Sequence, residues 1–287
     1  MRKAIAMASI PSASSAQPVA VPRVVVRHSA LVRVCHWVNA LCFLMLLMSG
    51  MQIFNARPAL SWGEASQFQH PFLSFSARED ANGDPVGGVT TVFGRAFDTT
   101  GLLGASRGSD GDMEERAFPS WATLPAEQDL AMGRRWHFFF AWLLIINGLV
   151  YVANLLIGRH LSDLLPSRAD LKAIPRAVLD HARLRFPKGD EALRYNVLQK
   201  LAYCSVVVAF PVLVLAGLTM SPAMDAAFPW LVPLFHGRQS ARTIHFVLAT
   251  YLVAFVGVHI LMVLVSGVFN NMRSMITGRY RISEETR

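Results

Sequence analysis

The sequence predicts an all-α fold: a transmembrane four-helix bundle with a long loop on its outer side. Of the 287 residues, 53% are hydrophobic and only 16% are charged, whereas soluble domains carry about 25% charged residues. The mean hydropathy is +0.37. Four apolar segments are long enough to cross a bilayer, which requires about 20 helical residues. All other segments are too rich in Gly, Pro or charge to qualify.

Spans and connecting segments are expected to alternate along the chain. The predicted order is a cytoplasmic N-terminal tail 1–33, a span 34–54, a periplasmic loop 55–135, a span 136–157, a cytoplasmic loop 158–197, a span 198–220, a periplasmic loop 221–243, a span 244–269 and a cytoplasmic tail 270–287. Residues 1–21 are rich in Ala, Ser and Pro and lack the continuous apolar core of a signal peptide. We therefore expect them to form a disordered tail.

Lys and Arg are concentrated in the N-terminal flank, in loop 158–197 and in the C-terminal tail. Positive residues favour the cytoplasmic side of a membrane. The distribution therefore predicts a multi-pass protein of a bacterial inner membrane with both termini in the cytoplasm. The net charge of +8 resides in these loops, so the expected partner is the lipid bilayer, and no nucleic-acid partner is expected.

Loop 55–135 is net acidic and longer than a simple connection requires. Two interpretations remain open: a docking surface or cap on the outer face, or a solvated, partly disordered insertion. The three cysteines, Cys35, Cys42 and Cys204, all lie in apolar runs. We expect them to be small buried side chains without a disulfide framework.

Four of the nine histidines lie in the predicted spans. Ionisable residues in membrane helices are costly and usually functional. His245 and His259 are 14 residues apart on the fourth span, which places them on one helix face and about 21 Å apart along the axis. One helix therefore presents one imidazole near each membrane surface.

The direction of each span gives the depth of the other two histidines. His36 opens the first span near the cytoplasmic face, the depth of His259, and His137 opens the second span near the outer face, the depth of His245. Each couple offers two opposed nitrogens, as a bis-histidine haem iron requires. No CxxCH motif is present, so the sequence predicts two non-covalent b-type haems. Zinc or copper is less suitable, because such a site needs several ligands that converge on one point, often with Cys or carboxylate. Here the two couples are about 20 Å apart, and the spans contain no acidic residue.

Gly50 and Gly148 lie on the same helix faces as His36 and His137, respectively, each at the depth of the other couple. A helix beside a flat macrocycle benefits from lacking a side chain there. The alternative is that these glycines serve helix packing, which is common in membranes.

Short motifs at the helix ends carry a family resemblance. They are Arg33-Val34-Cys35-His36-Trp37-Val38-Asn39, Leu46-Leu47-Met48-Ser49-Gly50, Arg135-Trp136-His137-Phe138, Tyr195-Asn196-Val197-Leu198-Gln199-Lys200 and the His245/His259 pair. In their order and spacing the chain resembles the di-haem cytochrome b subunits of nickel-iron hydrogenase, formate dehydrogenase and thiosulfate reductase. The resemblance covers the four spans but neither the outer loop nor the N-terminal tail.

The resemblance implies quinone chemistry beside the cytoplasmic-side haem. Asn196, Gln199 and Lys200 then become candidate quinone-binding residues, although they could equally anchor a helix start. Arginines near the helix ends could pair with haem propionates or serve as interface anchors; these are Arg134, Arg135 and Arg242 for the outer haem and Arg33 for the inner one.

The resemblance also implies a periplasmic redox partner. The long outer loop resembles that of a subgroup whose partners are molybdopterin oxidoreductases, so the expected partner is an enzyme of this class. The predicted function is an electron-transfer subunit of an oxidoreductase complex, working between the membrane quinone pool and that partner, with no catalytic residue of its own. Two alternatives stay open. One is a stand-alone quinone-linked oxidoreductase for a small oxidant such as superoxide, and the other is a haem-free transporter or anchor.

Overall fold

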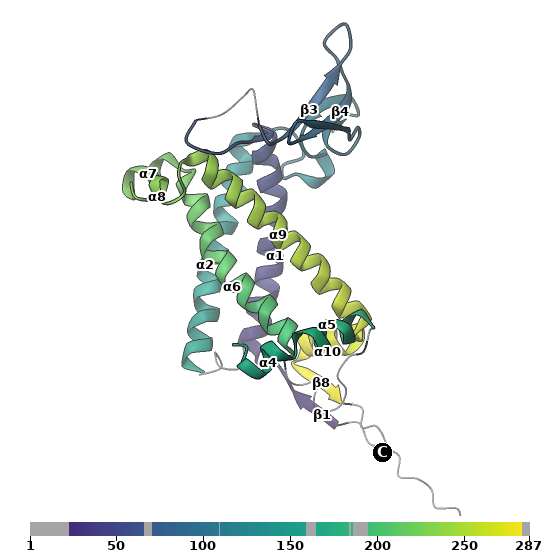
Figure 1. Ribbon diagram of the computed structural model, residues 1–287, viewed down its shortest axis with the longest axis vertical. Helices are drawn as coiled ribbons and strands as arrows, with labels where there is room; N and C mark the ends of the chain where they lie inside the picture. Colours follow the sequence, from purple (N-terminus) through teal and green to yellow (C-terminus); the bar gives the residue numbers. More distant parts are fainter. Residues whose placement is uncertain are drawn as a thin grey trace, which may run out of the picture.

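The computed structural model describes residues 23–65, 71–108, 110–158, 165–183, 185 and 195–282. Four helices in this part of the chain are long and apolar enough to cross a membrane: α1 (Ala30–Asn55), α2 (Leu130–Ile157), α6 (Val197–Thr219) and α9 (Arg238–Val265). They form the central bundle (Figure 1). The prediction of four spans is confirmed, whereas the expected disordered tail 1–21 lies outside the described residues.

Local sequence sets the helix ends. Ser29 caps α1 by accepting a hydrogen bond from the Val32 N–H at 3.3 Å, and Asp129 caps α2 through the Met132 N–H at 2.9 Å. The helix of the fourth predicted span ends at Val265, before the predicted limit at Phe269. At Gly267 the chain takes a φ of +108°, which favours glycine, and continues as the separate helix α10 (Val268–Thr277).

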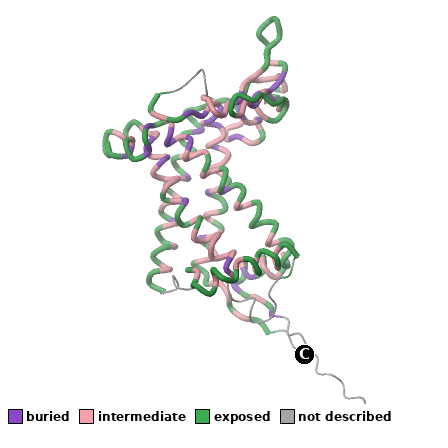
Figure 2. The backbone as a smooth tube through the Cα atoms, viewed as in Figure 1, coloured by how far each residue is buried: buried purple, intermediate pink, exposed green. Residues whose placement is uncertain are grey.

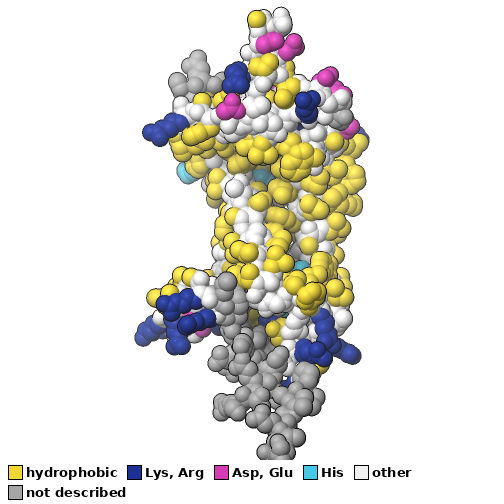
Figure 3. Space-filling view, turned by 90° about the vertical axis from the view of Figure 1, so that its right-hand side faces the viewer, with side chains coloured by type: hydrophobic (Ala, Val, Ile, Leu, Met, Phe, Trp, Pro, Cys, Tyr) yellow, Lys and Arg dark blue, Asp and Glu magenta, His cyan; other side chains and the backbone are white. Residues whose placement is uncertain are grey.

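Helix packing divides the bundle into two pairs, because α1 packs mainly on α2 and α6 mainly on α9. The face of the bundle drawn in Figure 3 is an apolar band between two charged ends. Five exposed tryptophans lie towards the two ends of the molecule, as is typical at membrane interfaces; these are Trp37, Trp62, Trp121, Trp136 and Trp230. Trp142, in contrast, is exposed near the middle of α2.

The all-α prediction is wrong for the long loop, which contains β structure. Four strands form an antiparallel sheet in the order β2 (Ala59–Leu60), β3 (Leu73–Glu79), β4 (Pro85–Val92) and β5 (Arg95–Asp98), and a hairpin of β6 (Gly104–Arg107) and β7 (Met113–Arg116) packs against it. We call residues 59–116 the β subdomain and its end of the bundle the outer end. Gly88 permits the close packing, since a Cβ there would overlap the Leu103 carbonyl.

Buried side chains gather where the β subdomain meets the helices (Figure 2). Phe54 from α1, Leu60 from β2 and Phe75 from β3 form one apolar core with Ala117. The Phe246 ring of α9 lies 4.9 Å from the Phe54 ring, between centroids. This core fixes the β subdomain to the ends of α1 and α9.

Shorter elements complete the two ends. The outer end also carries the 3₁₀ helix η1 (Ser120–Ala122), α7 (Pro222–Ala227) and α8 (Leu231–Leu234). The inner end carries α4 (Arg168–Lys172), α5 (Ile174–Ala182) and α10. There β1 (Arg23–Val26) pairs antiparallel with β8 (Arg279–Ile282), so the two terminal segments lie together (Figure 1). The Trp37 indole N–H of α1 donates to the Met275 carbonyl at 3.1 Å and holds α10 in place.

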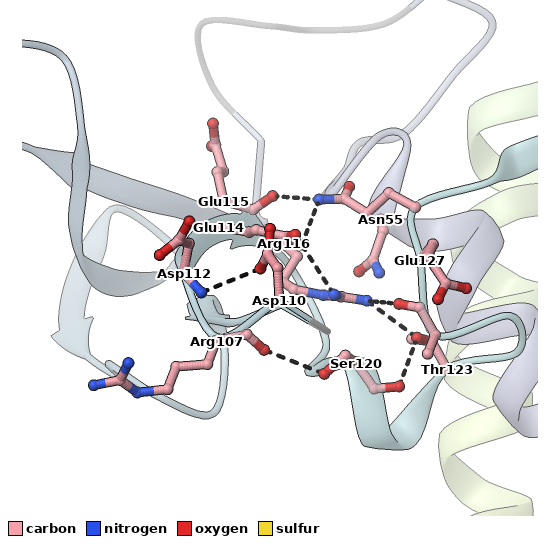
Figure 4. Close-up of polar contacts among 12 residues, drawn as sticks. Asn55, Arg107, Asp110, Asp112, Glu114, Glu115, Arg116, Ser120, Thr123 and Glu127 are labelled. Atoms are coloured by element: carbon pink, nitrogen blue, oxygen red, sulfur yellow. Dashed lines mark hydrogen bonds and ion pairs between the residues drawn. The ribbon is translucent and has the colours of Figure 1, made fainter.

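Arg116 at the end of β7 is buried and ties the β subdomain to the segment before α2 (Figure 4). Its guanidinium donates to the Glu114 carboxylate at 3.0 Å, the Thr123 hydroxyl at 3.1 Å and the Ala126 carbonyl at 2.9 Å. Buried charges are tolerated only when they are paired and hydrogen-bonded in this way.

We predict that Arg116→Met lowers the stability of the β subdomain by about 3 kcal/mol, because Glu114 and three further acceptors lose their donor. Pulse proteolysis of the purified protein across a denaturant series measures this change. Arg95→Met is the matched control, since Arg95 lies exposed on β5. Equal stability of the two variants would contradict the role given to Arg116.

Candidate functional site

The structure brings the four histidines of the bundle together as two couples. The imidazole centroids of His36 on α1 and His259 on α9 are 6.4 Å apart, and those of His137 on α2 and His245 on α9 are 6.2 Å apart. We call these the inner couple and the outer couple. Each couple bridges between the helix pairs α1–α2 and α6–α9. The pairing expected from span direction therefore agrees with the observed geometry.

Each histidine lies six or seven residues from the nearer end of its helix, which is about 10 Å of helix rise. The couples therefore occupy two separate depths within the apolar band. His245 and His259 project from one face of α9, so this helix contributes to both couples.

The ring separation within each couple suits two imidazoles that share one metal ion. Metal–imidazole bonds are about 2 Å long, so two opposed imidazoles on one ion have centroids about 6.3 Å apart. In the described part of the chain, no group of three or more His, Cys, Asp or Glu side chains gathers as a metal site. The chemistry on offer is thus two nitrogen ligands per site, the donor set of a six-coordinate haem.

Hydrogen bonds hold both rings of the outer couple by their Nδ1 atoms. His245 Nδ1 lies 2.9 Å from the Leu213 carbonyl oxygen of α6, and His137 Nδ1 lies 3.1 Å from Ser49 Oγ of α1. The Ser49 hydroxyl itself donates to the Met45 carbonyl at 2.6 Å, so its oxygen accepts from the imidazole. These bonds select the tautomer that carries its proton on Nδ1 and leave Nε2 as the ligand.

The inner couple is held by packing instead. The Phe255 ring stacks on the His259 ring at 6.1 Å, with 9° between the planes, and the Trp37 ring meets the His36 ring edge-on at 5.2 Å. His36 Nδ1 is buried and has no hydrogen-bond partner among the described residues.

Asn147 of α2 fixes the α1 segment that carries His36. Its buried side-chain amide donates to the Cys35 carbonyl at 2.9 Å and to Asn39 Oδ1 at 2.7 Å. Polar bonds between membrane helices resist slippage because the unpaired alternative in hydrocarbon is unfavourable. Sequence reasoning missed Asn147, although an Asn in the middle of an apolar span is a signal that could have identified it.

Two glycines lie against the outer imidazoles. A Cβ on Gly217 of α6 would lie 3.2 Å from His245 Cε1, and a Cβ on Gly50 of α1 would lie 3.4 Å from His137 Cε1. Gly50 thus adjoins a candidate ligand ring. A Cβ on Gly148 would meet nothing within 4 Å. Gly217 was missed from the sequence.

The segment that follows α1 straps the first turns of α9. The Gly63 carbonyl accepts from the Gln239 N–H at 3.0 Å, and the Thr243 hydroxyl donates to the Ser61 carbonyl at 2.8 Å. Arg242 donates to the carbonyls of Arg57 and Ala59. This strap, residues 57–63, sets the height of α9 and therefore of His245.

The other predicted arginines differ in their surroundings. Arg134 and Arg135 are exposed on the first turns of α2, and the Arg134 guanidinium lies over the Phe138 ring at 5.7 Å. Arg33 donates to the Ile276 carbonyl of α10 and has a buried Nε without a partner among the described residues. Arg33 Nε therefore retains an unused donor near the inner couple.

The three candidate quinone residues lie together at the start of α6 and make local bonds. Asn196 and Gln199 form a reciprocal capping box, and Lys200 Nζ bonds Asp170 Oδ2 at 2.9 Å. The Ser167 N–H and Lys200 hold the pKa of the Asp170 carboxyl at about 2. The structure adds His181 of α5, whose Nε2 lies 3.3 Å from Asn196 Nδ2.

Comparison with known proteins identifies the family. A family model described as prokaryotic cytochrome b561 matches residues 27–278. The chain belongs to the prokaryotic cytochrome b561 family. Membership confirms the family resemblance drawn from the sequence and implies haem b in a membrane cytochrome.

A relative of this cytochrome b561 comes from Azospira oryzae (strain ATCC BAA-33 / DSM 13638 / PS). It is described as "Putative protein-methionine-sulfoxide reductase subunit YedZ1" and is 29% identical over 237 residues. The matched region covers 82% of this chain and 89% of the relative. The two proteins are therefore similar over most of their lengths.

The donor set of this cytochrome fits haem b. Each couple presents two imidazoles and no carboxylate, the outer rings have their Nδ1 atoms engaged, and the ring spacing suits a shared iron.

We predict that Gly217→Ala lowers haem content, because the new methyl group would displace the His245 ring that it meets at 3.2 Å. Gly257→Ala is the control, since a Cβ there meets nothing within 4 Å. Pyridine haemochrome quantitation on both purified variants measures the difference. Full haem content in Gly217→Ala would show that His245 does not depend on this clearance.

Proposed function

We propose that this protein is a membrane di-haem cytochrome b that passes electrons between a membrane quinone and a redox partner at the outer end. The observation that carries the proposal is the presence of two imidazole couples at two depths of the apolar band, each with the ring spacing of a bis-histidine iron site. His36 and His259 would ligate the inner haem, and His137 and His245 the outer one. When bound, each haem supplies a one-electron iron couple without an open coordination position.

The protein's own residues would position and insulate these groups. Ser49 and the Leu213 carbonyl orient the outer imidazoles, while Phe255 and Trp37 pack on the inner ones. Gly50 and Gly148 would give clearance beside the macrocycles, and the arginines Arg33, Arg134, Arg135 and Arg242 would lie near the propionates. The lipid-facing apolar surface would keep water from the sites.

The inner end is the proposed quinone side. It carries many of the Lys and Arg residues of the described chain (Figure 3), which favours a cytoplasmic location for this end and for both termini in a bacterial inner membrane. Asn196, Gln199 and Lys200 could contact a quinone carbonyl there, with His181 beside Asn196.

The outer end is the proposed partner side. The β subdomain is a folded surface beside the outer couple, and Asp and Glu outnumber Lys and Arg in residues 57–129. The relative from Azospira oryzae is described as an oxidoreductase subunit, which supports a periplasmic oxidoreductase as the partner here.

The purified protein should contain two haems per chain by pyridine haemochrome quantitation. His259→Ala should reduce this to one, because the inner iron loses an axial ligand while the outer couple is untouched. Normal haem content in His259→Ala would contradict the ligand assignment. A colourless wild-type protein would indicate a transporter or anchor instead.

A comparison of Lys200→Met with Asp170→Asn tests the quinone site. If Lys200 contacts the quinone, Lys200→Met should slow haem reduction by a quinol at least tenfold, while Asp170→Asn should leave the rate nearly unchanged. Stopped-flow reduction at equal haem content measures both, and Lys172→Met is a basic control from α4. Equal loss in the first two variants would mean that the Lys200–Asp170 ion pair only anchors α4 to α6.

A further inference from the structure

The two couples differ in what contacts Nδ1 of each imidazole, the ring nitrogen that would not ligate the iron. Both outer rings make an Nδ1 hydrogen bond, to Ser49 Oγ and to the Leu213 carbonyl. In the inner couple, no hydrogen bond joins His36 or His259 to any described residue, and His36 Nδ1 is buried without a partner. The span pattern gives each couple two opposed histidines, but the hydrogen-bond surroundings of the two couples differ.

Ser49 is built into this contact. Its side chain is fully buried, and its hydroxyl hydrogen is directed to the Met45 carbonyl. The lone pairs of Ser49 Oγ therefore face His137. Gly50, the next residue, leaves room for the ring at 3.4 Å. A larger residue at Gly50 would crowd the imidazole that Ser49 binds.

An acceptor on Nδ1–H makes an imidazole a stronger electron donor through Nε2. A stronger axial donor favours ferric over ferrous iron, and such hydrogen bonds around the ligands are one means by which a protein tunes haem potential. The direction follows directly: an Nδ1 acceptor lowers the reduction potential, and its removal raises it.

We propose that Ser49 is a positioning residue that fixes the His137 tautomer and lowers the reduction potential of the outer haem. The reference is the same haem without the hydrogen bond from His137 Nδ1 to Ser49. Among the described residues, no equivalent Nδ1 acceptor lies beside the inner couple. This inference rests on the proposed function, because it requires His137 to be an axial ligand.

Nearby charges and burial also influence the reduction potentials of the two haems, in addition to the hydrogen bond of Ser49. Arg33 adds positive charge near the inner couple, and acidic residues predominate in the segment at the outer end. Burial of the outer rings disfavours the charged ferric state and so opposes the effect of Ser49. A substitution confined to Ser49 removes only the side-chain acceptor, because it changes neither net charge nor backbone and leaves the backbone hydrogen bond between His137 and Leu46 in place.

The test is a spectroelectrochemical titration of the purified holoprotein carrying Ser49→Cys or Ser49→Ala. Cysteine is nearly the size of serine and a weaker acceptor, whereas alanine removes the acceptor. We expect the outer potential to rise from wild type through Ser49→Cys to Ser49→Ala. The total shift should approach a tenfold change in the reduction equilibrium, or about 59 mV for one electron. The inner potential should stay unchanged.

Thr250→Val provides the control, since the Thr250 hydroxyl makes the same kind of bond, to the Phe246 carbonyl at 2.9 Å, without touching an imidazole. Neither potential should move in that variant. The low-spin ferric EPR signal of the outer haem should change in the Ser49 variants and not in Thr250→Val. If Ser49→Ala loses its outer haem, Ser49→Cys decides the question.

Unchanged outer potential and EPR signal in a Ser49 variant that retains both haems would overturn the proposal. Equal shifts of both haems would overturn it as well, because the effect would then not be local to His137. Failure of the proposed function has a different signature: wild-type protein without two haems.

Discussion

Four imidazoles inside an apolar layer impose the constraint on which this structure depends. Nitrogen donors and acceptors in hydrocarbon must find partners within the protein, since water is scarce there. The outer couple meets this demand through Ser49 and the Leu213 carbonyl. The inner rings are held by aromatic packing, and His36 Nδ1 has no hydrogen-bond partner among the described residues. In each couple the ring nitrogens not used in these contacts remain available to ligate iron, and membership of the cytochrome b561 family implies haem b.

The position of α9 determines whether both couples can form, because this helix supplies one histidine to each. Its outer half is fixed by the strap 57–63, through bonds to Gln239, Arg242 and Thr243. Its inner half continues into α10, which Trp37 of α1 holds by a hydrogen bond. The β subdomain thus has a structural role besides any contact with a partner, since it carries the strap between α1 and α9.

Much of the bundle could be predicted from the sequence. Hydropathy located the spans, and the 14-residue spacing of His245 and His259 placed them on one face, because helical periodicity is a local property. The β subdomain could not be predicted in this way. Its strands are short, and they pair across turns whose closeness depends on contacts such as Gly88 against Leu103. The pairing of β1 with β8 joins opposite ends of the chain, and no local pattern indicates such a contact.

The candidate site, too, could be predicted from the sequence only in part. Histidine depths followed from span direction, but partner choice among polar side chains did not. Lys200 bonds Asp170, which lies 30 residues earlier, and Arg242 bonds carbonyls of the strap; both contacts depend on tertiary packing. The Leu213 carbonyl has no side-chain signature at all. Ser49 stood within a motif noted for its resemblance to the family, yet only the structure brings its hydroxyl to His137.

The most direct test of the account is the low-temperature EPR spectrum of the oxidised, purified protein. Two opposed imidazole couples predict two low-spin ferric signals that together integrate to two spins per chain. A single low-spin signal, or a dominant high-spin ferric signal, would mean that at least one couple does not ligate a haem iron, and would contradict the central claim.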